Sequence, residues 1–463
     1  MALLGACRTS PTLPDLGAIY DRAAQHSDAE RNPVVVIPGL LGSTLRDADG
    51  TIVWGAFSGR FARPETPEGA RQFALPMREG ARLDELHDDV LPDGALERLE
   101  LRLFGLPFVL SAYRNILATL GVGGYRDESL GLSGAVDYGD EHFTCFQFDY
   151  DWRRDIPENA RRLGAFLREK RVFVAEATGQ DPDSIRFDIV AHSMGGLVLR
   201  WFLRFGEALD APLSGGTTSV PWDGAPLVER AVLIGSPNAG SLDALTRLVE
   251  GYHPSFLTPR YPPAVLGTLP SAYQLLPRAR HGALSATPDD PEALGTLDPL
   301  SPELWARNGW GLADPASAKV LAELLPDHTP DDRARIALDH QSKCLARAAE
   351  VTRALDAPSR PPQGTDLFLV CGDAISTPAR VAVDADGAIE VCAYGPGDGT
   401  VLRASALLDE RTPDSWTPRL VTPVDWAAVT FLFSDHLGMT RDPVFVDNVL
   451  YLLLEAPREG PAQ

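Results

Sequence analysis

The chain has 463 residues, of which 44% are hydrophobic and 8% aromatic, so it can bury a sizeable core. Its 64 acidic and 42 basic side chains leave a formal net charge of −22. Such an acidic balance disfavours nucleic acid as a partner and gives no electrostatic attraction toward an anionic membrane. Because the sequence has no run of about 20 apolar residues, no transmembrane helix is expected.

The N-terminal residues leave the location of the protein open. Leu4, Gly5, Ala6 and Cys7 resemble the lipobox at which bacterial lipoproteins are cleaved and acylated, but only six residues precede Cys7. A secretory signal needs a charged region and about 7–15 apolar residues before its cleavage site. The protein is therefore a cell-envelope lipoprotein whose true start lies upstream, or a cytoplasmic protein with a chance match. Residues 1–31 are expected to be a mobile segment or a signal remnant.

The first strand is expected within residues 32–42, where a β-branched run ends at Pro-Gly and a loop follows. Residues 46–105 have a mixed, acidic composition and are assigned to a cap. Their aromatic side chains Trp54, Phe57 and Phe61 are candidates for docking on a lipid surface. Packing in the core under the cap is the preferred interpretation.

Strands and helices then alternate. Residues 142–152 alternate apolar and polar side chains, as a strand does, and residues 156–179 carry an apolar stripe with helical spacing. A second strand and helix follow at 184–206, and a further strand at 228–237. Repeated strand–helix units of this length predict a mostly parallel sheet flanked by helices.

The alternation stops at residues 251–345, which are rich in Pro, Asp and Leu and are assigned to a second cap insertion. A strand resumes at 365–373. Residues 380–395 are expected to form a hairpin with Asp386-Gly387 at its turn, and residues 447–456 a closing helix.

Ser193 stands where a predicted strand meets a predicted helix. A nucleophile elbow needs small residues two positions before and two after its serine, because the strained turn otherwise drives side chains into the neighbouring strand and helix. Those positions hold Ala191 and Gly195. We therefore expect Ser193 to be a nucleophile and residues 32–463 to form one α/β-hydrolase domain with the two cap insertions.

A serine hydroxyl needs a base and an orienting acid, which in this fold follow in the order Ser, Asp or Glu, His. His436 lies on a loop after the last predicted strands and is expected to be the base. His340 falls in a predicted cap helix, where a capping or solvated role is expected. His192, beside the serine, is assigned to packing.

Two aspartates compete for the role of the acid. Asp373 ends a predicted strand, whereas Asp398 lies in the glycine-flanked loop GPGDGTV. Either could instead serve an Asx turn or a helix cap. The residues alone leave the choice between them open.

An oxyanion hole needs two backbone N–H groups aimed at the developing charge. One usually belongs to the residue after the nucleophile, here Met194. The other comes from the loop after an early strand, where Leu40 in IPGLLGS is the best candidate. No metal or cofactor is expected.

Several motifs together resemble the lecithin:cholesterol acyltransferase family, which includes lysosomal phospholipase/transacylase-like enzymes. In chain order they are VVVIPGLLGSTL (34–45), YDWR (150–153), AHSMGG (191–196), GSPNAGS (235–241), GDGTV (397–401) and DH (435–436). The resemblance implies Ser193 as nucleophile, Asp398 as acid, His436 as base, and the amides of Leu40 and Met194 as the oxyanion hole. The preference for Asp398 over Asp373 comes from this resemblance.

The chain also departs from the mammalian members, which carry a disulfide-closed lid soon after the first strand. Residues 46–105 contain no cysteine, so a lid here depends on packing alone. Specificity for lecithin or cholesterol is not expected to carry over.

The function expected from these observations is serine-dependent acyl transfer from a lipid ester, through an acyl-serine, to an alcohol or to water. Such an enzyme would be an O-acyltransferase, a phospholipase or a lipase. The alternative is a soluble carboxylesterase that acts on short acyl esters. A non-enzymatic binding module is disfavoured because all three triad positions are present.

Overall fold

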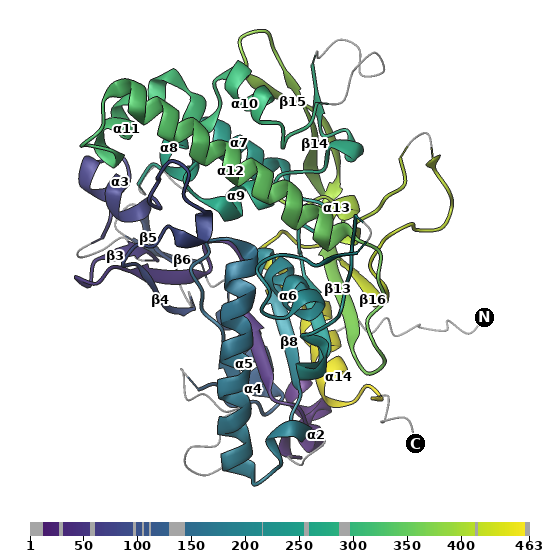
Figure 1. The fold of residues 1–463 in the computed structure, drawn as a ribbon. Coiled ribbons are helices and arrows are strands. Elements are labelled where there is room, and N and C mark those ends of the chain that lie inside the picture. The colour runs from purple at the N-terminus through teal and green to yellow at the C-terminus, as the bar shows by residue number, and fades with distance from the viewer. Residues whose placement is uncertain are drawn as a thin grey trace.

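The structure is a computed structural model that describes residues 13–26, 31–55, 61–95, 99–103, 106–110, 113–128, 144–214, 216–253, 259–286, 297–412 and 415–458. Figure 1 shows a sheet with its flanking helices, covered at one end by a largely helical cap. Cys7 and Phe57 lie outside the described residues. No helix in the described part of the chain is long and apolar enough to cross a membrane.

The base of the molecule is a parallel sheet of six strands, in the order β16–β13–β11–β8–β1–β7. Their bounds are β1 (Val34–Ile37), β7 (Cys145–Gln147), β8 (Phe187–His192), β11 (Val228–Ile234), β13 (Asp366–Gly372) and β16 (Trp426–Leu432). The predicted parallel sheet is confirmed, and with it the α/β-hydrolase fold.

Strand β7 is shorter than the strand predicted at 142–152. Beyond Phe148, whose amide still donates to the Val36 carbonyl at 2.9 Å, the chain leaves the ladder and forms a buried turn. There the Tyr150 amide donates to the Ser43 hydroxyl at 3.1 Å, and the Trp152 indole donates to the Ser43 carbonyl at 3.2 Å. The side chain and main chain of Ser43, the first residue of β2 (Ser43–Arg46), thus take the place of partners in the ladder. The alternation of apolar and polar residues does not reveal these partners.

Alternate residues of the strands point to two separate cores. On one face Val35, Ile37, Ile189 and Ala191 pack with helices α5 (Ile156–Thr178) and α6 (Met194–Phe205). On the other face Val34, Val36 and Val190 pack with α4 (Arg114–Val122) and α14 (Pro443–Leu454). Because parallel strands are covered on both faces, they are nearly continuously apolar.

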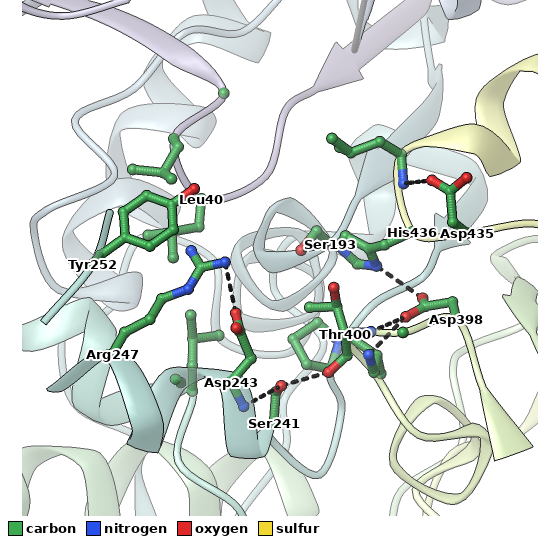
Figure 2. A pocket seen from close by; sticks show the side chains of 18 of the residues that line it. Leu40, Ser193, Ser241, Asp243, Arg247, Tyr252, Asp398, Thr400, Asp435 and His436 are labelled. Carbon is green, nitrogen blue, oxygen red and sulfur yellow. Dashed lines mark hydrogen bonds and ion pairs between the residues drawn. The ribbon is translucent and has the colours of Figure 1, made fainter. Parts of the chain in front are cut away.

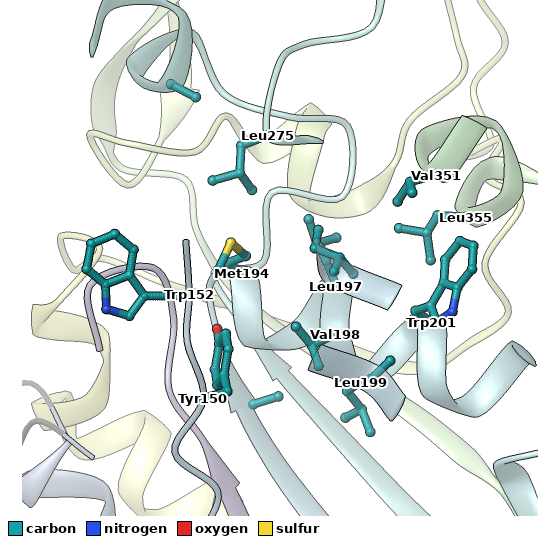
Figure 3. Packing of buried hydrophobic residues seen from close by; sticks show 14 of the residues in the cluster. Tyr150, Trp152, Met194, Leu197, Val198, Leu199, Trp201, Leu275, Val351 and Leu355 are labelled. Carbon is teal, nitrogen blue, oxygen red and sulfur yellow. The ribbon is translucent and has the colours of Figure 1, made fainter. Parts of the chain in front are cut away.

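Every residue of α6 is buried, including the two arginines Arg200 and Arg204. Figure 3 shows Met194, Leu197 and Trp201 of this helix against Leu275, Val351 and Leu355. Leu275 directly follows α9 (Pro270–Gln274), and Val351 and Leu355 both lie in α12 (Pro330–Asp356). The helix that begins at the nucleophile therefore packs against these segments as well as against the sheet.

The cap consists of short helices and one long one. Its helices are α3 (Pro67–Phe73), α7 (Leu242–Glu250), α8 (Pro263–Leu266), α9 (Pro270–Gln274), α10 (Pro302–Asn308), α11 (Ala318–Leu324) and α12 (Pro330–Asp356). The predicted hairpin is present as β14 (Ile375–Val383) and β15 (Ile389–Gly397), with Gly387 at φ 83° in its turn. Helix α12 continues past residue 345, where the second cap insertion was expected to end.

The remaining elements are short. They are α1 (Leu16–Ile19), α2 (Asp21–Gln25), α13 (Arg403–Leu407), β3 (Ile52–Trp54), β4 (Leu91–Ala95), β5 (Leu99–Leu103), β6 (Leu106–Leu110), β9 (Leu213–Ser214), β10 (Thr217–Thr218) and β12 (Leu284–Ser285). Helices α1 and α2 lie within residues 1–31, the segment for which the sequence predicts a mobile segment or a signal remnant. Tyr20 between them is buried, and its hydroxyl donates to the Asp447 carboxylate at 2.7 Å.

A buried ionic cluster ties the first cap insertion to the base. The fully buried guanidinium of Arg153 pairs with Asp151 at 2.8 Å and with Asp88 at 2.7 Å. It also donates to the carbonyl oxygen of Phe73 at 2.9 Å. Since a buried charge is tolerated only when it is paired and hydrogen-bonded, this guanidinium holds residues 73–88 of the cap against the turn after β7.

Candidate active site

Ser193 occupies the sharp turn between β8 and α6. Its backbone angles are φ 54° and ψ −126°, a strained conformation for a residue with a side chain. Small neighbours permit the turn: Ala191 is fully buried, and a Cβ on Gly195 would lie 2.9 Å from the Ile37 carbonyl. A Cβ on Gly39 would lie 2.7 Å from the Cβ of Ser193. The turn therefore has the geometry of a nucleophile elbow.

The three residues predicted as a triad lie in one hydrogen-bonded row (Figure 2). His436 Nε2 is 3.0 Å from the Ser193 hydroxyl, and His436 Nδ1 is 2.8 Å from the Asp398 carboxylate. Each residue follows the end of a strand: Ser193 follows β8, Asp398 follows β15 and His436 lies four residues beyond β16. With Nδ1–H donating to Asp398, Nε2 is free to accept the serine proton.

The Asp398 carboxylate uses both of its oxygens. One faces His436, and the other accepts from the amides of Thr400 at 2.9 Å and Val401 at 2.7 Å. Burial raises the pKa of Asp398, but the charge and hydrogen bond of His436 and the two amides bring the pKa below its ordinary value. The carboxylate is therefore ionised at neutral pH.

The competing candidates lie elsewhere. Asp373 is at the surface end of β13, where its side chain is 29% exposed and 3.9 Å from Arg403. His340, expected to cap a helix or to be solvated, is instead buried in α12, with Nε2 3.0 Å from the Thr268 carbonyl. Helix α12 has a long buried face, and sequence reasoning did not place His340 on it. Neither residue reaches Ser193.

The two residues predicted to donate to the oxyanion are Met194 and Leu40. Met194 opens α6, so its amide is one of those that a helix leaves without an internal partner. The Gly39 carbonyl accepts from the Gly42 amide at 3.0 Å. Because the peptide is planar and trans, this bond directs the Leu40 N–H to the opposite side. Gly39 itself is in contact distance of Ser193, and Leu40 lines the pocket beside it.

Ser193, Asp398 and His436 open into a cavity of about 440 Å³. Much of the lining is apolar, and it comes from the base and from both predicted cap insertions: Leu40, Leu41, Trp54, Leu275, Val401 and Leu437. Trp54 is buried, as expected for core packing, and its indole donates to the Leu41 carbonyl at 2.8 Å. Phe61 is partly buried. The cavity suits an apolar acyl chain next to a polar reaction centre.

Sequence reasoning missed several polar residues of the site. Arg247 pairs with Asp243 at 2.8 Å and lies 4.0 Å above the ring of Tyr252, all three at the pocket wall (Figure 2). The spacing of Asp243 and Arg247 on α7 is an ordinary surface pattern, and Tyr252 follows that helix, so nothing in the sequence distinguishes the three residues.

Asn238, within the motif GSPNAGS, does have a sequence signal. Its side chain accepts from Arg200 at 3.0 Å and donates to the Ala406 carbonyl at 2.7 Å. It thereby joins α6, which begins at the nucleophile, to α13, which follows the Asp398 loop. Ser241, at the end of the same motif, donates to the Thr400 carbonyl at 2.6 Å and accepts from the Asp243 amide at 3.2 Å.

The segment that contains Ser193 is similar in sequence to a known protein family. Residues 135–281 match the model of the lecithin:cholesterol acyltransferase family. The resemblance predicted from the motifs is confirmed over this segment, which includes Ser193. Leu40, Asp398 and His436 lie outside it. The family match supports a lipid ester acyltransferase or hydrolase. No curated protein sequence matches the chain.

The chain was also compared with solved structures. A chain in the crystal structure of the Tle4–Tli4 complex matches with a TM-score of 0.56 and 14% identity, over 92% of this chain and 98% of that chain. This likeness shows a shared fold. The mature lipase BlEst2 of Bacillus licheniformis has a TM-score of 0.32 and 13% identity, over 93% and 95% of the two chains. Lipase 1 of Pelosinus fermentans has a TM-score of 0.35 and 12% identity, over 92% of this chain and 99% of that chain.

Proposed function

We propose that this protein transfers acyl groups from lipid esters through an acyl-serine intermediate. The observation that carries the proposal is the row from Ser193 through His436 to Asp398, with distances of 3.0 and 2.8 Å, at the wall of a partly apolar cavity. The family match over residues 135–281 supports a lipid ester as the acyl donor.

In this mechanism the Ser193 hydroxyl oxygen attacks the ester carbonyl carbon while His436 Nε2 takes the hydroxyl proton. The resulting oxyanion accepts from the amides of Leu40 and Met194. Collapse of the tetrahedral species breaks the ester C–O bond, and His436 returns the proton to the departing alcohol. Asp398 remains ionised throughout and stabilises the imidazolium.

The acyl-serine carbonyl carbon is then attacked by an alcohol or by water, and in each case His436 takes the proton of the attacking hydroxyl. The acyl–Ser193 C–O bond breaks, and His436 returns this proton to the Ser193 oxygen. Exclusion of water from the cavity favours the alcohol. We infer that residues 46–105 and 251–345 act as a cap that provides this exclusion. Trp54 from the first segment and Leu275 from the second line the cavity together with Leu40 of the base, which supports this role.

A single experiment tests the proposal. Purified protein is given liposomes of a phospholipid with a labelled acyl chain, with and without a long-chain alcohol, and mass spectrometry follows free fatty acid and new ester. Label in the new ester identifies an acyltransferase, and label in the free acid alone identifies a lipase or phospholipase. Activity only on soluble short-chain esters would contradict a lipid substrate and indicate a carboxylesterase.

The matched variants are Ser193→Ala and Ser184→Ala. Ser184 is an exposed serine in the short turn before β8, so its loss should leave the rate unchanged. Ser193→Ala should abolish turnover and keep the fold, because the elbow accepts the smaller side chain. Full activity of Ser193→Ala would remove the proposed mechanism.

A further inference from the structure

Two buried tyrosines clamp the peptide bond between Pro38 and Gly39. The Tyr150 hydroxyl donates to the Pro38 carbonyl at 2.9 Å, and the Gly39 amide donates to the Tyr113 hydroxyl at 2.8 Å. These two main-chain groups belong to one planar unit, so the unit cannot rotate without breaking a buried hydrogen bond. The next peptide along the chain carries the N–H of Leu40.

The Tyr113 hydroxyl also reaches the residue before the nucleophile. It lies 3.3 Å from His192 Nδ1, while His192 Nε2 lies 3.0 Å from the main-chain oxygen of His436. The rings of His192 and His436 are 4.9 Å apart between centroids. His192 therefore stands between the loop that precedes Leu40 and the base.

The direction of each hydrogen bond in this row follows from the chemistry of its groups. A carbonyl oxygen only accepts, so His192 Nε2 carries a proton. Burial, together with the neighbouring His436, lowers the pKa of His192 to about 3, so the ring is neutral and Nδ1 accepts. Tyr113 then donates to His192 and accepts from Gly39. The Tyr113 hydroxyl thus has two partners, and each ring nitrogen of His192 has one.

We propose that Tyr113 and His192 are positioning residues that couple the oxyanion loop to the base through the row Gly39–Tyr113–His192–His436. The inference rests on the proposed function, since it assigns a purpose to these residues within that mechanism. His192 was expected to be a packing residue. A packing residue needs no polar atoms, and a buried polar pair costs stability unless every group is matched.

The row makes two parts of the reaction centre depend on each other. The oxyanion donor and the base must both be held within a fraction of an ångström of their productive positions. A shift of the Gly39 amide would move the Tyr113 hydroxyl, then His192, and then the main chain of His436. The row thus fixes the position of the Leu40 amide, which stabilises the charge, relative to His436, which moves the proton.

The test uses Tyr113→Phe and His192→Phe, which keep an aromatic ring and remove the polar atoms. Turnover of a soluble ester is measured together with the affinity for a small alkyl boronic acid, determined by calorimetry. The boronic acid forms a tetrahedral adduct with Ser193 in which one oxygen occupies the oxyanion position. We expect each variant to lose about 10- to 100-fold in kcat and in boronic acid affinity, with KM changed less than about threefold.

His192→Gln provides the rescue. Its amide can donate to the His436 carbonyl and accept from Tyr113, so it should recover at least about threefold in kcat relative to His192→Phe. The double variant Tyr113→Phe/His192→Phe should lose no more than the worse single variant, because both changes interrupt one row. Tyr273→Phe is the matched control: it removes a buried hydroxyl that donates to the Gly267 carbonyl at 3.0 Å in the cap, and should leave both quantities unchanged.

The coupling is refuted if folded Tyr113→Phe and His192→Phe keep wild-type kcat and boronic acid affinity, or if their losses multiply in the double variant. Thermal melts establish that each variant is folded, and His192→Gln tests the same row with less disturbance. These outcomes are separate from failure of the proposed function. In that case wild type would be inactive on esters, or Ser193→Ala would be as active as wild type.

Discussion

Replacement of Asp398 by asparagine should reverse the hydrogen bonds of the triad while leaving its shape intact. One oxygen of Asp398 accepts from the amides of Thr400 and Val401, at 2.9 and 2.7 Å. The asparagine oxygen will occupy that position, because an NH₂ group there would face two donors. Its NH₂ group then faces His436 Nδ1, which must accept.

The proton of His436 is consequently placed on Nε2, 3.0 Å from the Ser193 hydroxyl. In that tautomer the imidazole cannot accept the serine proton. The corresponding change in a serine protease triad lowers kcat by about 10⁴-fold, which is about 5 kcal/mol of activation free energy. We expect a loss of similar size for Asp398→Asn, with the protein folded.

The assay compares initial rates on a p-nitrophenyl ester for Asp398→Asn and Asp373→Asn, the same chemical change at the competing position. Asp373 belongs to a partly exposed ion pair with Arg403 at 3.9 Å, which is worth about 0–1 kcal/mol, so its variant should stay within about twofold of wild type. Activity of Asp398→Asn above a tenth of wild type, or a larger loss for Asp373→Asn, would refute the reasoning.

Two further predictions concern stability. Arg153→Met should lower the free energy of unfolding, measured by urea titration, by about 3 kcal/mol or more, because it removes the main partner of the fully buried Asp151. The control Arg46→Met removes an arginine whose side chain is 39% exposed and should change that free energy by less than about 0.5 kcal/mol. Equal effects of the two variants would contradict this view of the cluster. Burial alone would raise the pKa of Glu410, but the hydrogen bond and charge of Arg280 lower it to about 2 from an ordinary 4.5. A carboxylate with a lowered pKa stabilises the fold above its ordinary pKa and loses that contribution as pH falls. The difference in unfolding free energy between wild type and Glu410→Gln, about 1–2 kcal/mol at pH 7 after allowance for solvent screening, should therefore shrink between pH 5 and pH 2. A difference that stays constant over that range would show that the ion pair contributes nothing.

The sequence predicted those features that depend on strand order and local pattern. Ser193 and His436 follow strands, and apolar runs locate strands well. Asp398 could not be separated from Asp373 by residues alone, because both follow strands and carry the same group. The structure distinguishes them by the loop after β15, which turns the carboxylate inward toward His436 at 2.8 Å.

Features that depend on distant partners were not predictable. The burial of His340 requires Thr268, 72 residues earlier, and the early end of β7 requires Ser43, more than 100 residues earlier. The pairing of Tyr113 with His192 spans 79 residues, and Tyr113 belongs to none of the motifs, although His192 does. In each case the side chain is ordinary in its own segment and acquires its role only when the fold supplies a partner.

The separation of Ser193 and His436 by 243 residues also has a consequence in time. A ribosome that adds about 5–20 residues per second needs roughly 12–50 seconds to make that interval. Throughout this period the elbow can fold on β8 and α6, but its base has not been synthesised, and β16 has not joined the edge of the sheet. Because the proposed reaction needs His436 as its base, a growing chain cannot attack the lipids of its own cell before this residue has been synthesised.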